Sequence, residues 1–228
     1  MERKDKAIIF DCDGVLVDSE IIYSAIERKH LQKIGLIYTN VEYQERFLGL
    51  TNDDYIYELS ADYLEKYNKV FPTDYETSIA KESSVVFESE LKEIEGAASF
   101  INTLKTPSAV ASSSKLDTLH RKLELTGLKT LFGSHIYSGE QVLRGKPSPD
   151  LFLYSAKHLD VAAKQCVVIE DSINGVLAGV SAGMDVWGFV GGGHTNLDTA
   201  CRLYSAGATK VFTSYSSMAS YYFRCNAY

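Results

Sequence analysis

The sequence has little of what marks a disulfide scaffold or a zinc module. It holds four cysteines and four prolines in 228 residues, and no two cysteines form a CxxC pair or stand at zinc-ligand spacing. Cys12 and Cys166 fall in short apolar runs, so we expect both to be buried as small apolar side chains. This cysteine usage suits a reducing cytoplasm.

Positive charge and long apolar runs are also scarce. The chain has 23 Lys and Arg against 30 Asp and Glu, a net charge of −7, which argues against a nucleic-acid partner or an anionic membrane surface. Its charged beginning, Met1 to Lys6, is followed by only four apolar residues before Asp11. That run is too short for a signal peptide or a membrane span, so we expect a cytoplasmic protein.

The most informative segment that is present is the apolar run Ala7 to Phe10, which stops at Asp11 and Asp13 and is followed by Gly14. Such a run predicts a strand buried on both faces. Residues i and i+2 of a strand point the same way, so both carboxylates can face one volume at its carboxyl end, where ligands bind in open α/β sheets. Two such anions need a proton or a cation between them, which indicates Mg²⁺ chemistry.

The rest of the chain separates into a helical block and an alternation of helices with short strands. Residues up to about Glu90 show helical patterns rich in tyrosine, which we expect to pack a small helical domain. Later strands are predicted at Ser108 to Ala111, His135 to Tyr137, Cys166 to Ile169, Val186 to Val190 and Lys210 to Phe212. The pattern predicts an α/β fold: a parallel-sheet core of residues 1–17 and 91–228, with a helical cap of residues 18–90 inserted after the first strand. We expect the cap to stand over the carboxyl edge of the sheet as a lid.

Polar side chains follow several of these strands. They are Ser112 with Ser113, Lys146 in a Gly-Lys-Pro loop, and the pair Glu170-Asp171. Taken singly, a serine run or an acidic pair is usually a turn. Their occurrence at successive strand ends, which share one edge of a parallel sheet, predicts a single site. Two caps are also predicted: Ser148, with Pro149 in the first helical position, and Ser172.

Each of these groups has a coherent role in phosphoryl transfer. Asp11 and Asp171 are oxygen ligands suited to Mg²⁺. A carboxylate that is not fully engaged in binding the metal can attack phosphorus. Asp13 can act as the acid toward the leaving oxygen and then as the base toward water. Ser112 can hold phosphate oxygens, and Lys146 can balance the negative charge.

The same residues resemble the four motifs of the haloacid dehalogenase superfamily of phosphotransferases. The matches, in order along nearly the whole chain, are Asp11-Cys12-Asp13-Gly14-Val15, Ser112, Gly145-Lys146-Pro147 and Glu170-Asp171. The resemblance implies a Rossmann-like core with a helical cap, and a phosphoric monoester hydrolase that acts on a small phosphorylated metabolite. It implies Asp11 as nucleophile and Asp13 as acid and base. Phosphate would be held by Ser112, Ser113 and Lys146, and Mg²⁺ by Asp11, the Asp13 backbone carbonyl and Asp171, with Glu170 in or near this shell.

Within the superfamily the chain resembles the branch of β-phosphoglucomutase, phosphoglycolate phosphatase and small sugar phosphatases, and most of all the 6-phosphogluconate phosphatase type. Tyr23 stands where the mutases place a cap histidine, and Asn52 where they place an arginine that grips a second phosphate. We therefore expect a phosphatase, with Tyr23, Gly49 and Asn52 as candidates for substrate specificity, and a monomer as the default for a capped enzyme. A phosphomutase is the alternative. A switch phosphorylated on Asp11, without enzymatic activity, is a remote third possibility, because such modules need neither Asp13 nor a large cap.

Overall fold

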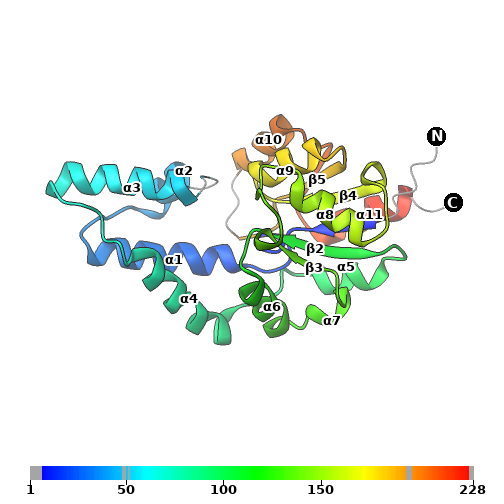
Figure 1. Cartoon of the computed structure of the whole chain (residues 1–228), viewed down its shortest axis with the longest axis horizontal. Coiled ribbons are helices and arrows are strands. Elements are labelled where there is room, and N and C mark those ends of the chain that lie inside the picture. Colours follow the sequence, from blue (N-terminus) through cyan, green and yellow to red (C-terminus); the bar gives the residue numbers. More distant parts are fainter. Residues whose placement is uncertain (1–6, 48–49, 51, 194–196, 226–228) are drawn as a thin grey trace. The chain divides into compact units, whose positions relative to one another are not determined.

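A computed structural model of the chain describes residues 7–47, 50, 52–193 and 197–225 (Figure 1). Residues 1–20 and 91–228 form one compact unit, which contains every described strand of the sheet. Residues 21–90 form a second, helical unit. In the sequence this second unit lies between the first and second strands of the first unit.

The first unit is built on a six-stranded parallel sheet in the order β3-β2-β1-β4-β5-β6. Its strands are β1 (Ala7–Phe10), β2 (Ser108–Ser112), β3 (Ile136–Ser138), β4 (Cys166–Glu170), β5 (Asp185–Phe189) and β6 (Lys210–Phe212). β1 pairs with β2 on one side and with β4 on the other, so the strand order reverses at β1. The predicted α/β fold with a parallel sheet is confirmed, and the reversal point is where such sheets bind ligands.

Helices cover both faces of this sheet. They are α5 (Ala97–Thr103), α6 (Leu116–Leu125), α7 (Lys129–Phe132), α8 (Asp150–His158), α9 (Ile173–Ser181), α10 (Leu197–Ala206) and α11 (Tyr215–Cys225), with 3₁₀ turns η1 (Gly139–Gln141) and η2 (Ala163–Gln165). Helices α8, α9 and α10 pack on one face, whereas α7 and α11 contact strands from the other and α5 packs against both of them. The first unit is therefore a three-layer sandwich, as expected for parallel strands joined by helical crossovers.

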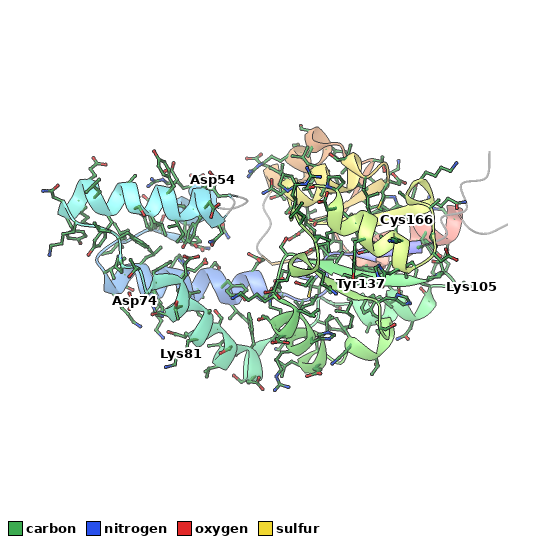
Figure 2. All side chains as sticks on the ribbon, viewed as in Figure 1. Asp54, Asp74, Lys81, Lys105, Tyr137 and Cys166 are labelled. Carbon is green, nitrogen blue, oxygen red and sulfur yellow. The ribbon has the colours of Figure 1, made fainter. Side chains whose placement is uncertain are left out.

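The core explains why β1 is apolar at every position. Alternate side chains enter opposite layers: Ile9 lies in the cluster that includes Phe152, whereas the Phe10 ring packs edge-on against Phe100 and Phe132. Cys12 is buried as predicted, and so is Cys166, which Figure 2 labels in the first unit. A strand that is buried on both faces holds the residues at its carboxyl end in fixed positions.

One of the two helix caps was predicted correctly. The Ser172 hydroxyl accepts a hydrogen bond from the Gly175 amide at 3.0 Å and caps α9. The prediction for Ser148 was wrong: α8 begins one residue later than expected, Pro149 is its capping residue, and the Ser148 hydroxyl donates to Asp150 Oδ1 at 2.7 Å. The Asp150 carboxylate captures this hydroxyl, which is therefore not used on a backbone amide.

The second unit consists of α2 (Asn40–Phe47), α3 (Asn52–Tyr67), α4 (Tyr75–Glu90) and most of α1 (Ser19–Lys33). The prediction that tyrosines pack its interior holds for Tyr43, Tyr55 and Tyr75, which are buried and whose hydroxyl groups form a chain with separations of 3.0 and 2.9 Å. Tyr57 and Tyr67 are exposed instead. Among all described helices, none is both long enough and apolar enough to cross a membrane.

Candidate active site

The polar residues predicted to form a site meet at the carboxyl edge of the sheet. Phe10 in β1 is in register with Val110 in β2 and with Ile169 in β4. Asp11, the next residue, therefore lies level with the ends of both neighbouring strands, and its amide donates to the Ile169 carbonyl at 2.9 Å. Glu170 ends β4 beside it.

A tight turn after β1 places Asp13. Gly14 adopts a positive φ of 74°, a conformation that glycine enters without steric cost, and its amide donates to the Val17 carbonyl at 2.9 Å. The Val17 amide in turn donates to the Cys12 carbonyl at 3.0 Å. The buried Tyr215 hydroxyl donates to the Val15 carbonyl at 2.9 Å and fixes the turn to the core.

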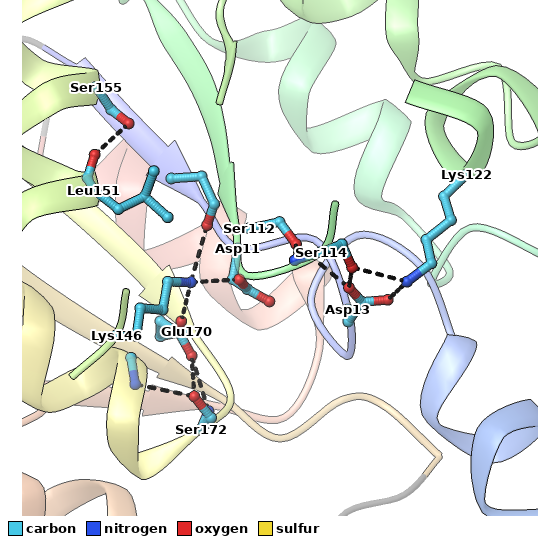
Figure 3. Close-up of polar contacts among 12 residues, drawn as sticks. Asp11, Asp13, Ser112, Ser114, Lys122, Lys146, Leu151, Ser155, Glu170 and Ser172 are labelled. Atoms are coloured by element: carbon cyan, nitrogen blue, oxygen red, sulfur yellow. Dashed lines mark hydrogen bonds and ion pairs between the residues drawn. The ribbon is translucent and has the colours of Figure 1, made fainter. Parts of the chain in front are cut away.

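Lys146 joins the first aspartate to the end of β4 (Figure 3). Its Nζ lies 2.5 Å from Asp11 Oδ1 and 2.6 Å from Glu170 Oε1, and it donates to the Ala111 carbonyl at 2.9 Å. Only 5% of the Lys146 side chain is exposed. A buried ammonium between two carboxylates is satisfied by charge and by hydrogen bonds, which makes this a rigid arrangement.

Glu170 is held from its other side by the start of α9. The Ser172 amide and hydroxyl both donate to Glu170 Oε2 at 2.9 Å. Gly175 leaves the space that this carboxylate occupies, because a Cβ built on Gly175 would lie 1.7 Å from Glu170 Oε1. The orientation of Glu170 is therefore set by the residues around it.

Asp13 has a separate set of partners, of which Figure 3 labels Ser112, Ser114 and Lys122. Its Oδ1 accepts hydrogen bonds from the Ser19 hydroxyl and from Lys122 Nζ. Its Oδ2 accepts from the Ser114 hydroxyl at 2.8 Å and lies 3.4 Å from the Ser112 hydroxyl. Ser114 and Lys122 were not predicted as site residues from the sequence, although the spacing of Lys122 from Leu119 and Leu123 places it on the apolar face of α6.

The electrostatics of the two aspartates differ. Burial raises the pKa of Asp11 well above its usual value; Lys146 opposes this, and the nearby charges of Glu170 and Asp171 raise it further. Burial also acts to raise the pKa of Asp13. The charge and hydrogen bond of Lys122, together with the hydrogen bonds of Ser19 and Ser114, outweigh burial, so the pKa of Asp13 falls below the ordinary aspartate value.

Three carboxylates could hold a metal ion. One oxygen each of Asp11, Glu170 and Asp171 lies within 4.8 Å of the others. The donors are all hard oxygens, which is the set that Mg²⁺ and Ca²⁺ prefer. The elevated pKa of Asp11 in this anionic group is the response expected of a carboxylate that a cation would stabilise. The residues present thus fit a divalent cation.

The remaining predicted residues have more varied surroundings. Ser112 is buried at the end of β2, and Ser113 after it is exposed. Within the helical unit, the Tyr23 ring packs edge-on against Phe87 at 5.2 Å, and the Asn52 amide donates to Glu76 at 2.7 Å. Gly49 lies outside the described residues. The specificity roles of these cap residues stay predictions.

Comparison with protein families identifies the class to which this fold and site belong. Residues 8–189 match the family model of haloacid dehalogenase-like hydrolases, and the chain is a member of that family. Its relatives include phosphatases that align over most of its length, and the chain is a phosphoric monoester hydrolase.

Individual relatives agree with this class. 6-Phosphogluconate phosphatase of Escherichia coli K12 is 31% identical over 83% of this chain and 84% of its own. The structure of a hydrolase of this family from Deinococcus radiodurans R1, with bound phosphate and sodium, is 34% identical with a TM-score of 0.84, covering 99% of this chain and 98% of that one. A β-phosphoglucomutase candidate from Thermotoga maritima is 27% identical with a TM-score of 0.76, covering 98% and 99%.

Proposed function

We propose that this chain is a Mg²⁺-dependent phosphatase that hydrolyses a small sugar phosphate, or a related organophosphate monoester, through an aspartyl-phosphate on Asp11. The observation that carries this proposal is the contact of Asp11 with Lys146, beside Glu170 and Asp171, while Asp13 is held by other donors two residues away. The sugar phosphatase among the relatives supports the substrate class.

The first step belongs to Asp11 and Asp13. An Asp11 carboxylate oxygen attacks phosphorus, the bond from phosphorus to the ester oxygen breaks, and the leaving alcohol takes a proton from Asp13. Lys146 balances the charge of the nucleophile and of the transferred group, and Ser112 and Ser113 hold phosphate oxygens. The product of this step is an acyl phosphate on Asp11.

The second step returns the enzyme to its starting form. Asp13, now ionised, takes a proton from water as the water oxygen attacks phosphorus. The acyl phosphate bond breaks, inorganic phosphate leaves, and Asp11 is again a carboxylate.

Carboxylates of the site and one backbone carbonyl would bind the divalent cation. Asp11, Asp171 and the Asp13 carbonyl would hold Mg²⁺, with Glu170 near or in its shell. When bound, the ion neutralises phosphate charge and keeps Asp11 ionised. This chain's own contribution is to hold those ligands in place through Lys146, Ser172 and Gly175.

The role of the cap, the cellular location and the oligomeric state are also part of what we propose. We propose that the cap, residues 18–90, selects the alcohol part of the substrate with Tyr23, Gly49 and Asn52, and that the protein is a cytoplasmic monomer. A phosphomutase is the second candidate, since one structural relative is a β-phosphoglucomutase candidate. A mutase must grip a second phosphate, and the neutral Asn52 amide, bonded to Glu76, speaks against that grip.

The decisive experiment incubates the protein with Mg²⁺ and a panel of sugar phosphates and measures inorganic phosphate. We expect release by the wild type and none by Asp11→Asn. Acid-quenched protein should carry phosphate on the peptide that contains Asp11, as judged by mass spectrometry. Failure of the Mg²⁺-loaded protein to turn over any member of the panel would count against the proposal.

The same assay separates the two candidates. A phosphatase gives phosphate as its dominant product without any primer. A mutase gives an isomerised sugar phosphate and needs a bisphosphate. A phospho-Asp11 that persists in the wild type without turnover would instead favour a switch.

A further inference from the structure

Lys122 is a buried cation that the proposed chemistry leaves without a role. It lies in the middle of α6, with 1% of its side chain exposed, between the buried Leu119 and Leu123. An apolar residue is expected at such a position, because a buried ammonium is costly unless it is paired. Its Nζ is paired with Asp13 Oδ1 and lies 3.2 Å from the Ser114 hydroxyl.

Each of the two lysines of the site pairs with a different aspartate. Lys146 reaches Asp11 from the loop after β3, whereas Lys122 reaches Asp13 from α6. The partners of Asp13 also divide between its two oxygens. Oδ1 takes the ammonium together with the Ser19 hydroxyl, while Oδ2 meets only serine hydroxyls among its contacts with described residues.

Because their partners differ, the two oxygens of Asp13 differ in the hydrogen bonds that they can make. An ammonium can only donate, so it holds Oδ1 in one place as an acceptor. A serine hydroxyl can rotate and either donate or accept, so it tolerates a proton on Oδ2. Oδ2 also lies beside Ser112, the residue we assign to phosphate.

We propose that Lys122 is a positioning residue, which anchors Asp13 by Oδ1 so that Oδ2 carries the proton to the leaving oxygen. This inference rests on the proposed function, because it concerns the acid step. Lys122 acts through Asp13 and does not itself touch the substrate. Its removal should therefore matter most for substrates whose leaving group needs a proton.

The test compares Lys122→Met with the wild type on two substrates. The methionine keeps most of the side-chain length and removes the ammonium. One substrate is the best sugar phosphate from the panel. The other is p-nitrophenyl phosphate, whose nitrophenolate leaves without protonation. The value of kcat/KM is used because it covers the steps through release of the leaving group.

For the sugar phosphate we expect kcat/KM to fall about 100-fold, the lower end of what acid–base catalysis contributes, with KM nearly unchanged. For p-nitrophenyl phosphate the loss of kcat/KM should stay within about threefold, because the nitrophenolate leaving group needs little acid catalysis. In an Asp13→Asn background, Lys122→Met should add no further loss, because both changes remove the same interaction.

Controls separate this inference from the function on which it rests. Lys129→Met removes a lysine that pairs with Glu124 at the surface and should leave both activities unchanged. Equal losses on both substrates, or additive losses with Asp13→Asn, would overturn the positioning role. A wild type that releases no phosphate from either substrate would overturn the proposed function itself. If Lys122→Met does not fold, Lys122→Gln, a neutral donor, must show the same difference between substrates.

Discussion

Gly175 is the residue whose substitution tests the site most directly. A Cβ at this position would lie 1.7 Å from Glu170 Oε1, so Gly175→Ala must displace a carboxylate that also pairs with Lys146. We expect kcat to fall about 100-fold, as for a misplacement of about 1 Å in a catalytic group. The free energy of unfolding should drop by about 1–3 kcal/mol through overpacking. Steady-state kinetics and urea denaturation measure the two effects.

Gly179 in the same helix provides a matched control. A Cβ there would lie 2.7 Å from Cγ2 of Val186, a buried β-branched side chain in the apolar core. Gly179→Ala should therefore lower stability and leave kcat close to the wild type. Loss of activity in both variants would mean that the helix as a whole, and not Glu170, had moved.

The site residues that could be predicted from the sequence are those at the ends of apolar strands. Asp11, Ser112 and Glu170 follow or end apolar strands, so strand periodicity alone brings them to one edge. Lys122 could not be assigned to Asp13 in the same way, since its contact depends on how α6 packs. The contact of the Ser19 hydroxyl with Asp13 was also not predictable in this way, because it depends on the turn after Gly14.

At the scale of an element, α1 carries a carboxylate with an unusual environment inside the helical unit. Glu27 Oε2 accepts a hydrogen bond from the Tyr43 hydroxyl, which continues to Tyr55 and Tyr75. Burial raises the pKa of Glu27 to about 7, and the Tyr43 hydrogen bond only partly offsets this. The folded helical unit thus holds the proton of Glu27 more tightly than the unfolded chain does.

The sign of the resulting pH dependence follows from this. The contribution of Glu27 is fully present below pH 4.5, its ordinary pKa, and is lost as the pH rises through about 7. We expect the unfolding free energy to fall by about 1–3 kcal/mol across that interval from this group, and Glu27→Gln to remove most of the slope. Urea denaturation followed by circular dichroism at several pH values measures it.

An exposed glutamate of α2 serves as the reference for this measurement. Glu45→Gln changes the same charge at the surface and should keep the wild-type slope. If Glu27→Gln also kept it, the buried Glu27 carboxyl would not be the origin of the pH dependence.

At the scale of the whole molecule, removal of divalent metal should stop turnover without unfolding the protein. A chelator should reduce phosphate release to the level of Asp11→Asn, and added Mg²⁺ should restore it, because the three carboxylates lose their shared cation. Mg²⁺ at 100 times its dissociation constant should stabilise the protein by about 2.7 kcal/mol. Thermal melts with and without Mg²⁺ test this, and Asp171→Asn should shrink the gain.

The α/β fold could be predicted from the sequence because strands and helices alternate from Ala97 onward, and their apolar residues recur with clear periods. The strand order was less accessible, since it depends on which side of β1 each later strand joins. The helical unit was predicted as a block, but which of its side chains meet a substrate depends on surroundings that periodicity does not encode.

The central place of β1 bears on how activity is regained after denaturation. Asp11 acquires Lys146 and Glu170 only when β2 and β4 have joined opposite sides of this strand, across long separations in the sequence. Individual helices can form earlier from local contacts. In a refolding time course, enzymatic turnover should therefore return later than the far-ultraviolet signal, which would make catalysis a reporter for completion of the sheet.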